Sequence, residues 1–223
     1  MGLTPEQLEA RMHYVGASDV AGVMGLSPFS TPYEVWSSKF TPKEFEDITG
    51  EAKPPEKDWK SSRLGELLEP AVVELACEYL QYEYVEGAAQ IQFRHIDDIL
   101  VVSPDLFMPA NQWVYRKKPQ EDPTFVEAKT QGFTGIPLET YGRGGSGQIP
   151  KRVMLQVQSQ LACTPSVQKA WVALLSGHDA KGHRMFPVKR NPELIDAILV
   201  SVDRFWNKYV VKKTPPAKDL MYV

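Results

Sequence analysis

Two short apolar segments of the sequence end in side chains that could bind a metal ion and hydrolyse a bond. Asp105 follows the segment Leu100-Val-Val-Ser-Pro, and Glu127 and Lys129 end the segment Thr124-Phe-Val-Glu-Ala-Lys. Apolar runs rich in β-branched residues are typical of buried strands. If these strands lie side by side, an Asp, a Glu and a Lys meet at one point, because side chains two residues apart share a strand face.

This set of side chains suits hydrolysis that depends on a hard divalent cation. Two carboxylates and a carbonyl are ligands that Mg²⁺ prefers, and bound Mg²⁺ keeps several waters for chemistry. Lys129 could hold such a water or help to remove its proton. The sequence therefore predicts a Mg²⁺ site where the two segments end.

Length and composition predict one globular domain. The chain has 223 residues, of which 43% are hydrophobic and 24% are charged. Its apolar runs fall short of the roughly 18 residues that a membrane span needs, and its start lacks the pattern of a signal peptide. Cys77 and Cys163 make no disulfide framework and no metal-ligand spacing, so we expect a reducing cytoplasm.

Charge is unevenly distributed along the chain. The net charge is −3 overall, −6 over residues 61–130 and +7 over residues 131–223. An acidic part that concentrates metal ions beside a basic part that holds phosphates would suit a metal-dependent nuclease. Taken alone, the pattern is explained more simply as an ordinary charged surface.

Residues 1–62 are expected to be mainly helical. Pro5 favours a helix over 4–11, and Ser18 could be the N-cap of a helix that ends near Gly25. The capping box Thr31-Pro-Tyr-Glu predicts a helix that runs to about Phe40. Residues 41–60, which are rich in Pro and Gly and mixed in charge, indicate an exposed loop.

The core is expected over residues 63–190. Apolar residues at helical spacing predict a helix from Arg63 to about Tyr82, with Glu69 at the edge of the apolar stripe and Pro70 either in the first turn or at a kink. Alternation predicts a strand over 88–95. Further strands are expected at the following ranges: 99–102, 111–117, 124–129, 167–175 and 183–189.

The remaining elements are a loop and two helices. The six glycines of residues 132–150 predict a mobile loop. A helix over 151–163 places Gln156 and Gln160 on one face, while Gln158 points away and is interpreted as structural. A last amphipathic helix over 192–213 is the main element of the C-terminal part, residues 191–223.

Five local patterns in this order resemble the lambda exonuclease or YqaJ-like viral recombinase family of restriction-endonuclease-like PD-(D/E)xK nucleases. The patterns are Arg11-x6-Ser18, Gly65-x3-Glu69, Ser103-Pro-Asp105, Glu127-Ala-Lys129 and Gln156-Val-Gln158. The resemblance implies an α/β (α+β) fold with a restriction-endonuclease-like core, in which helices flank a central mixed β-sheet. It also implies that residues 1–62 hold a site for a DNA end.

The resemblance implies a Mg²⁺-dependent 5′-to-3′ exonuclease, with Mn²⁺ as an alternative metal and no need for ATP. Such an enzyme degrades one strand of linear double-stranded DNA to 5′-mononucleotides and leaves a 3′ overhang for phage-type recombination. The implied assembly is a homotrimeric ring, and the implied partner is a single-strand annealing recombinase. The implied location is the cytoplasm of a bacterial host, without membrane attachment.

The resemblance also assigns roles to individual residues. The catalytic set would be Asp105, Glu127, Lys129, Glu69 and Gln156. The metal ligands would be Asp105, Glu127, the backbone carbonyl of Ala128, and Glu69. The 5′-phosphate of DNA would be bound by Arg11, Ser18 and Ser103.

Two other functions remain open from the residues alone. The chain could be another PD-(D/E)xK nuclease that cuts DNA internally, or a DNA-end-binding module without catalysis. Each residue also has an ordinary interpretation. Glu69 could be an exposed helix former, Asp105 a turn residue, and Glu127 with Lys129 a surface ion pair.

Overall fold

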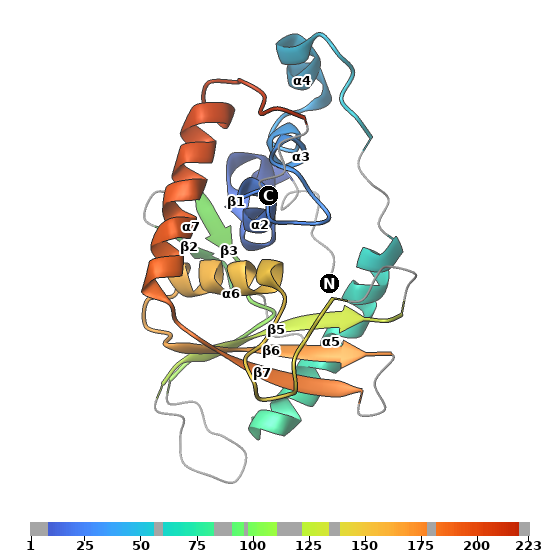
Figure 1. Ribbon diagram of the computed structural model, residues 1–223, viewed down its shortest axis with the longest axis vertical. Coiled ribbons are helices and arrows are strands. Elements are labelled where there is room, and N and C mark those ends of the chain that lie inside the picture. Colours follow the sequence, from blue (N-terminus) through green and yellow to red (C-terminus); the bar gives the residue numbers. More distant parts are fainter. Residues whose placement is uncertain are drawn as a thin grey trace.

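Helices cover both faces of a four-stranded mixed β-sheet, as predicted (Figure 1). The strand order is β4-β5-β6-β7; β5 and β6 are parallel, and the other two pairs are antiparallel. Their bounds are Leu106–Met108, Thr124–Gln131, Lys169–Ser176 and His183–Lys189. This computed structural model describes residues 9–55, 60–82, 91–95, 98–110, 122–133, 139–177 and 182–218.

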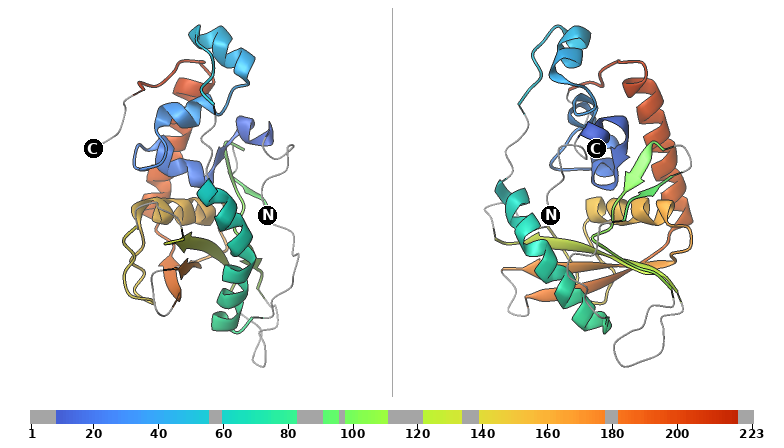
Figure 2. Two further views of the ribbon diagram at one scale, coloured as in Figure 1. Left: turned by 90° about the vertical axis from the view of Figure 1, so that its right-hand side faces the viewer. Right: turned by 180° about the vertical axis from the view of Figure 1, so that it is seen from behind.

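Strand alternation divides the sheet into two apolar faces. Phe125 and Val172 face α6 (Lys151–Cys163), while Val126 and Ala173 face α5 (Lys60–Leu80) on the other side. Figure 2 shows α5 and α6 on opposite sides of the strands. Glu127 and Lys129 have the parity of Phe125, so both belong to the α6 face.

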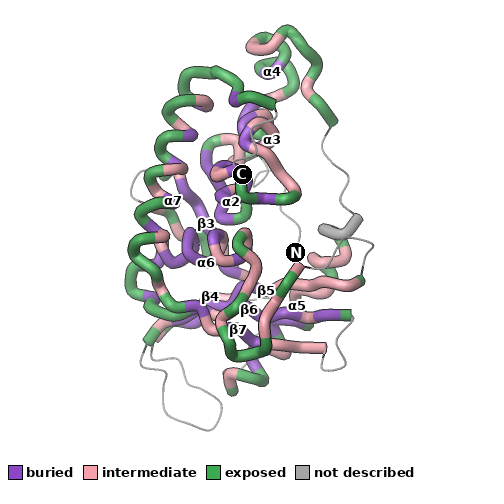
Figure 3. The backbone as a smooth tube through the Cα atoms, viewed as in Figure 1, coloured by how far each residue is buried: buried purple, intermediate pink, exposed green. Residues whose placement is uncertain are grey.

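A second apolar layer packs on the outer side of α6. It contains the helices α2 (Val20–Val23), α3 (Pro32–Ser37) and α7 (Pro192–Phe205), and a small sheet of order β1-β3-β2. These short strands are Val15–Gly16, Leu100–Val102 and Phe93–Arg94. Figure 3 shows that buried segments run through α6 and the strands beside it. The helix α6 is therefore enclosed between the main sheet and the helical layer.

The predicted capping box at Thr31 is confirmed, and a second box at Thr41 corrects the expected loop over 41–60. Thr31 and Glu34 exchange hydrogen bonds at the start of α3. Thr41 and Glu44 do the same at the start of α4 (Pro42–Thr49). This helix ends at Gly50, whose left-handed φ of 72° glycine adopts without strain.

Phe45 attaches α4 to the core. Its side chain is fully buried and lies 5.7 Å, ring to ring, from that of Trp36. The Phe45→Ala variant is expected to lower the free energy of unfolding by about 3–5 kcal/mol, because it leaves a cavity among aromatic rings. Urea unfolding measures this loss, with the exposed Lys43→Ala as the matched control in the same helix. A loss below about 1 kcal/mol would contradict the packing.

Several predicted boundaries change in the structure. The helix α5 begins at Lys60, so Pro70 lies inside it and not in the first turn. The predicted stripe is confirmed at Val72 and Ala76, which are buried together with Val73 and Cys77, whereas Tyr79 is exposed. The strand predicted over 88–95 is reduced to Phe93–Arg94 in its described part, and residues 83–90 and the strand predicted over 111–117 lie outside the described residues.

The C-terminal helix also ends earlier than predicted. After α7, a π-helical turn, η3 (Trp206–Val210), replaces the expected α-helix to residue 213. The indole nitrogen of Trp36 donates to the carbonyl oxygen of Tyr209 at 3.0 Å and joins α3 to this turn. The predicted helix over 151–163 is confirmed with the same bounds. Among the described helices, none is both long enough and apolar enough to span a bilayer.

Candidate active site

The register of β4 and β5 brings Asp105 beside Glu127. Leu106 pairs with Val126, so Asp105, one residue earlier, reaches the next part of β5. Its Oδ2 accepts a hydrogen bond from the backbone N–H of Ala128 at 2.6 Å. In the described part of the chain, no strand pairs with residues 127–131 of β5 on the β4 side. The two carboxylates therefore lie where one edge of the sheet opens.

The expected pairing of the strand over 99–102 with β5 is wrong. That segment, β3, belongs to the small sheet, where Val15 and Leu100 pair. The chain passes from the small sheet to the main sheet through Ser103 and Pro104, and proline has no N–H to donate to a ladder. Asp105 thus enters the site from the start of β4 and not from the end of β3.

Glu127 is held by three donors although its side chain is only 3% exposed. Lys129 Nζ lies 2.5 Å from Oε1, and Gln156 Nε2 donates to the same oxygen at 2.6 Å. Gln160 Nε2 donates to Oε2 at 2.5 Å. A buried carboxylate needs such donors, because removing an unpaired ion from water costs on the order of several kcal/mol. The ordinary alternative of a surface ion pair is therefore wrong, because Glu127 is buried and Lys129 is only partly exposed.

Three glutamines of α6 have two different functions. Gln156 and Gln160, four residues apart, point toward the sheet edge as their shared face predicts. Gln158 is structural, as interpreted, since it donates to the carbonyl oxygen of Lys189 at 2.7 Å and accepts from the N–H of Asn191 at 3.0 Å. Gln160 was not predicted as a site residue, although its four-residue spacing from Gln156 indicated that the two side chains share a face.

Glu69 approaches the same edge from α5. A Cβ built on Gly65 would lie 3.7 Å from Thr130 Oγ1, which places this turn of α5 beside the end of β5. Burial raises the pKa of Glu69, and the charge of Glu127 adds to the shift. Glu69 is thus close enough to Glu127 for the two charges to interact, although α5 covers the opposite face of the sheet.

The carboxylates repel each other in this arrangement. Burial, together with the charges of Glu127 and Glu69, holds the pKa of Asp105 well above its ordinary value. Among the described residues, no three side chains of His, Cys, Asp or Glu already converge on one point. An oxygen-rich set with excess negative charge still fits a hard divalent cation, which would relieve the repulsion.

A second cluster lies at the N-terminal end of the described chain. Arg11, in η1 (Arg11–His13), donates from Nη2 to Ser18 Oγ at 3.1 Å. The prediction that Ser18 caps a helix is wrong, because the N-cap of α2 is Asp19. Asp19 Oδ2 accepts the N–H of Gly16 at 3.2 Å. Ser103 makes no hydrogen bond to Arg11 or Ser18, although the structure describes all three residues.

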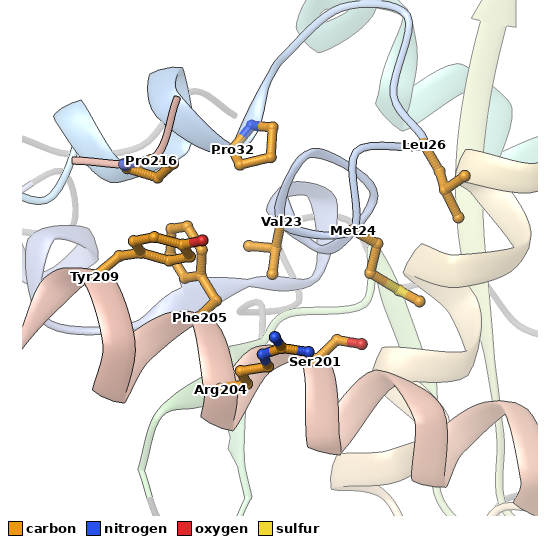
Figure 4. Close-up of a pocket in the computed structure, with 9 residues that line it drawn as sticks. All are labelled: Val23, Met24, Leu26, Pro32, Ser201, Arg204, Phe205, Tyr209 and Pro216. Atoms are coloured by element: carbon orange, nitrogen blue, oxygen red, sulfur yellow. The ribbon is translucent and has the colours of Figure 1, made fainter. Parts of the chain in front are cut away.

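A groove of about 390 Å³ lies apart from these clusters, between α2 and α7 (Figure 4). Its lining is mostly apolar, and Arg204 is its charged residue. The lining residues are Val23, Met24, Leu26, Pro32, Ser201, Arg204, Phe205, Tyr209 and Pro216. None of the predicted site residues lines it, so the groove is not the candidate active site.

A family profile and one curated relative match most of the chain. The profile of the YqaJ-like viral recombinase domain matches residues 6–166. The YqaJ protein of Bacillus subtilis (strain 168) is 27% identical over 219 residues, which cover 96% of this chain and 59% of that protein. The chain thus spans little more than half the length of this relative.

Solved structures share the fold. The crystal structure of an alkaline exonuclease from Laribacter hongkongensis matches with a TM-score of 0.57 and 18% identity, covering 95% of this chain and 94% of that one. Its complex with dAMP matches with a TM-score of 0.58, 18% identity and the same coverage of both chains. This similarity confirms the predicted restriction-endonuclease-like α/β fold. Because the domain profile spans most of the sequence, the chain belongs to the YqaJ-like viral recombinase family.

Proposed function

We propose that the chain is a Mg²⁺-dependent exonuclease that degrades the 5′-ended strand of linear double-stranded DNA to 5′-mononucleotides. The observation that carries this proposal is the open sheet edge where Asp105, Glu127 and Lys129 meet beside Gln156. Membership of a viral recombinase family supports a DNA substrate. The complex of the structural relative with dAMP, a mononucleotide, is in keeping with such a product.

Each residue of the site has a task in this proposal. Asp105, Glu127 and the carbonyl oxygen of Ala128 would hold the metal, with Glu69 nearby. When bound, the cation would neutralise charge on the scissile phosphate and lower the pKa of a coordinated water. Lys129 would hold the attacking water with its ammonium donors. Gln156 and Gln160 would keep Glu127 in position.

The Arg11–Ser18 cluster would bind the 5′-terminal phosphate. A guanidinium donates two parallel hydrogen bonds to phosphate oxygens, and the serine hydroxyl adds a third donor. The strand pairing of Val15 with Leu100 connects this cluster to the chain segment that leads to Asp105. A fixed separation between the end site and the catalytic edge would favour removal of terminal nucleotides over internal cutting.

The remaining parts of the proposal concern assembly and biological role. We propose a homotrimer that encircles DNA. A single-strand annealing protein would then bind the 3′ overhang, in a bacterial cell that carries a phage or prophage. These properties follow from the family resemblance. Size measurement by light scattering, with and without duplex DNA, tests the trimer independently of nuclease activity.

Three DNA substrates test the proposed activity. With Mg²⁺, a linear duplex with 5′-phosphates should be converted to mononucleotides faster than the same duplex with 5′-hydroxyls. A covalently closed circle should survive, and EDTA should stop all cleavage. Cutting of the circle would support the alternative of an endonuclease on the same fold. Binding of DNA without any cleavage in Mg²⁺ or Mn²⁺ would support the non-catalytic alternative.

A further inference from the structure

A buried lysine lies behind the Arg11–Ser18 cluster. The side chain of Lys39 is 2% exposed, and its Nζ lies 3.3 Å from Asp19 Oδ2. The same Nζ donates to the carbonyl oxygen of Arg11 at 3.1 Å. Lys39 follows α3 in the chain and is far in sequence from both partners. Removing an ammonium group from water is unfavourable, so a buried lysine needs an opposite charge close to it.

Asp19 connects the two cations. Its Oδ1 lies 3.3 Å from Arg11 Nη2, while Oδ2 accepts from Lys39 and from the N–H of Gly16. Burial alone would raise the pKa of Asp19, but the charges of Lys39 and Arg11 and the Gly16 hydrogen bond outweigh it and lower the pKa. Asp19 is therefore ionised and holds one side of the Arg11 guanidinium.

Gly16 leaves the space in which this contact forms. A Cβ at this position would lie 3.0 Å from Arg11 Nη2 and 3.4 Å from Asp19 Oδ2, so the guanidinium would have to move by a few tenths of an ångström. In the described part of the chain, the other guanidinium nitrogens of Arg11 have no hydrogen-bond partner. The Arg11 side chain is 32% exposed. Its outer side can thus accept an anion while its inner side is fixed.

A carboxylate beside a phosphate site needs an explanation. If Asp19 faced Arg11 alone, the pair would be neutral, and the carboxylate would repel an incoming phosphate. Lys39 changes this balance, because Arg11, Asp19 and Lys39 together carry a net charge of +1. Asp19 can then orient Arg11 without cancelling its attraction for an anion.

We propose that Lys39 and Asp19 are positioning residues that set the preference for a 5′-phosphate: Asp19 orients Arg11, and Lys39 offsets the charge of Asp19. This inference rests on the proposed end-binding function and names residues that act through Arg11 and do not touch the DNA. It explains why a lysine is buried at a position that the sequence alone does not connect to Arg11 or Ser18.

The test compares binding of two blunt DNA duplexes that differ only in a 5′-phosphate or a 5′-hydroxyl. Fluorescence anisotropy in EDTA gives the ratio of the two Kd values without any cleavage. The variants are Lys39→Met, Asp19→Asn and the double variant, with the exposed Lys43→Met as control. Thermal melting of each variant reports whether it is folded. The double variant replaces the buried ion pair with two uncharged side chains, a change that proteins often tolerate well.

The charges of Lys39 and Asp19 predict changes in opposite directions when each is removed. Lys39→Met should lower the preference for the phosphorylated duplex about tenfold, since it leaves a neutral Arg11–Asp19 pair. Asp19→Asn keeps a side-chain oxygen that can still accept from Arg11, so it should keep or raise the preference. The double variant, with its net charge of +1 restored, should lie within about threefold of the wild type. Lys43→Met should leave it unchanged.

Other results would overturn the proposal in distinguishable ways. If all three variants lose the preference together, Lys39 and Asp19 only support the local fold. If a folded Lys39→Met keeps the full preference, Lys39 has no part in phosphate binding. If the wild type itself binds both duplexes equally, the end-binding function fails, and the inference falls with it.

Discussion

Lys129→Met is expected to lower the rate of DNA hydrolysis by about 10²–10⁴-fold, the range typical of a lost group that positions or transfers a proton. Lys129 Nζ lies 2.5 Å from Glu127 Oε1 and is 18% exposed, so it stands between the buried carboxylate and the solvent-open edge. Methionine preserves the length of the side chain and removes its charge and its three donors. The loss should therefore appear in the reaction step.

The measurement is single-turnover cleavage of a 5′-phosphorylated linear duplex with saturating Mg²⁺. Lys189→Met is the matched control, because Lys189 is exposed at the end of β7 on the same sheet. Glu127 keeps Gln156 and Gln160 as donors in the variant, so the protein should remain folded. A rate within about threefold of the wild type would exclude Lys129 from the chemistry.

The sequence predicted the geometry of the candidate site at the sheet edge well, because that geometry depends on local rules. Glu127 and Lys129 share a face through the two-residue period of a strand, and the contact between them is 2.5 Å. Helix α6 was predicted with its observed bounds because its apolar spacing is regular and Pro150 precedes it. Asp105 was placed correctly at this edge, although the strand before it belongs to the small sheet and not to the main sheet. Ser103 and Pro104 separate the two sheets. Pro104 is a local signal of that break, but no local pattern shows that the strand before it belongs to a different sheet.

The features that were missed depend mostly on distant contacts. Lys39 meets Arg11 across 28 residues of sequence, and Gln160 meets Glu127 across 33. Burial of a lysine cannot be inferred from its neighbours in the sequence, because it requires a counter-charge from another element. The helix α4 is different, since Thr41 and Glu44 repeat the signal of Thr31 and Glu34. The surrounding Pro, Gly and charged residues concealed that signal.

Asp105→Asn is expected to stabilise the metal-free protein while it abolishes cleavage. In the wild type, Asp105 is buried near two other carboxylates, and this raises its pKa well above the ordinary value of 3.8. Asparagine removes the repulsion and keeps a side-chain oxygen to accept the N–H of Ala128. The free energy of unfolding in EDTA should rise by about 1–2 kcal/mol, the usual gain from relieving one unfavourable site.

The pH dependence of stability has a definite sign. A carboxyl group whose pKa is raised on folding favours the folded state while it is protonated, and this contribution is lost as the pH rises through the folded-state pKa. The difference in the free energy of unfolding between Asp105→Asn and the wild type in EDTA, measured by urea unfolding, should therefore grow as the pH rises above 3.8. The exposed Asp196→Asn serves as the control, with no expected change.

Mg²⁺ should reverse the order of the two proteins. A ligand that binds the folded state alone stabilises it in proportion to RT ln(1 + [L]/Kd). The wild type should gain stability with added Mg²⁺, whereas Asp105→Asn, which lacks one of the proposed ligands, should gain little. If the variant is destabilised in EDTA, the carboxylates are not in conflict in the free protein. If Mg²⁺ stabilises both proteins equally, Asp105 is not a metal ligand. The expected combination, higher stability with lost activity, would mean that the carboxylates at this sheet edge are retained as metal ligands although they repel each other in the free protein.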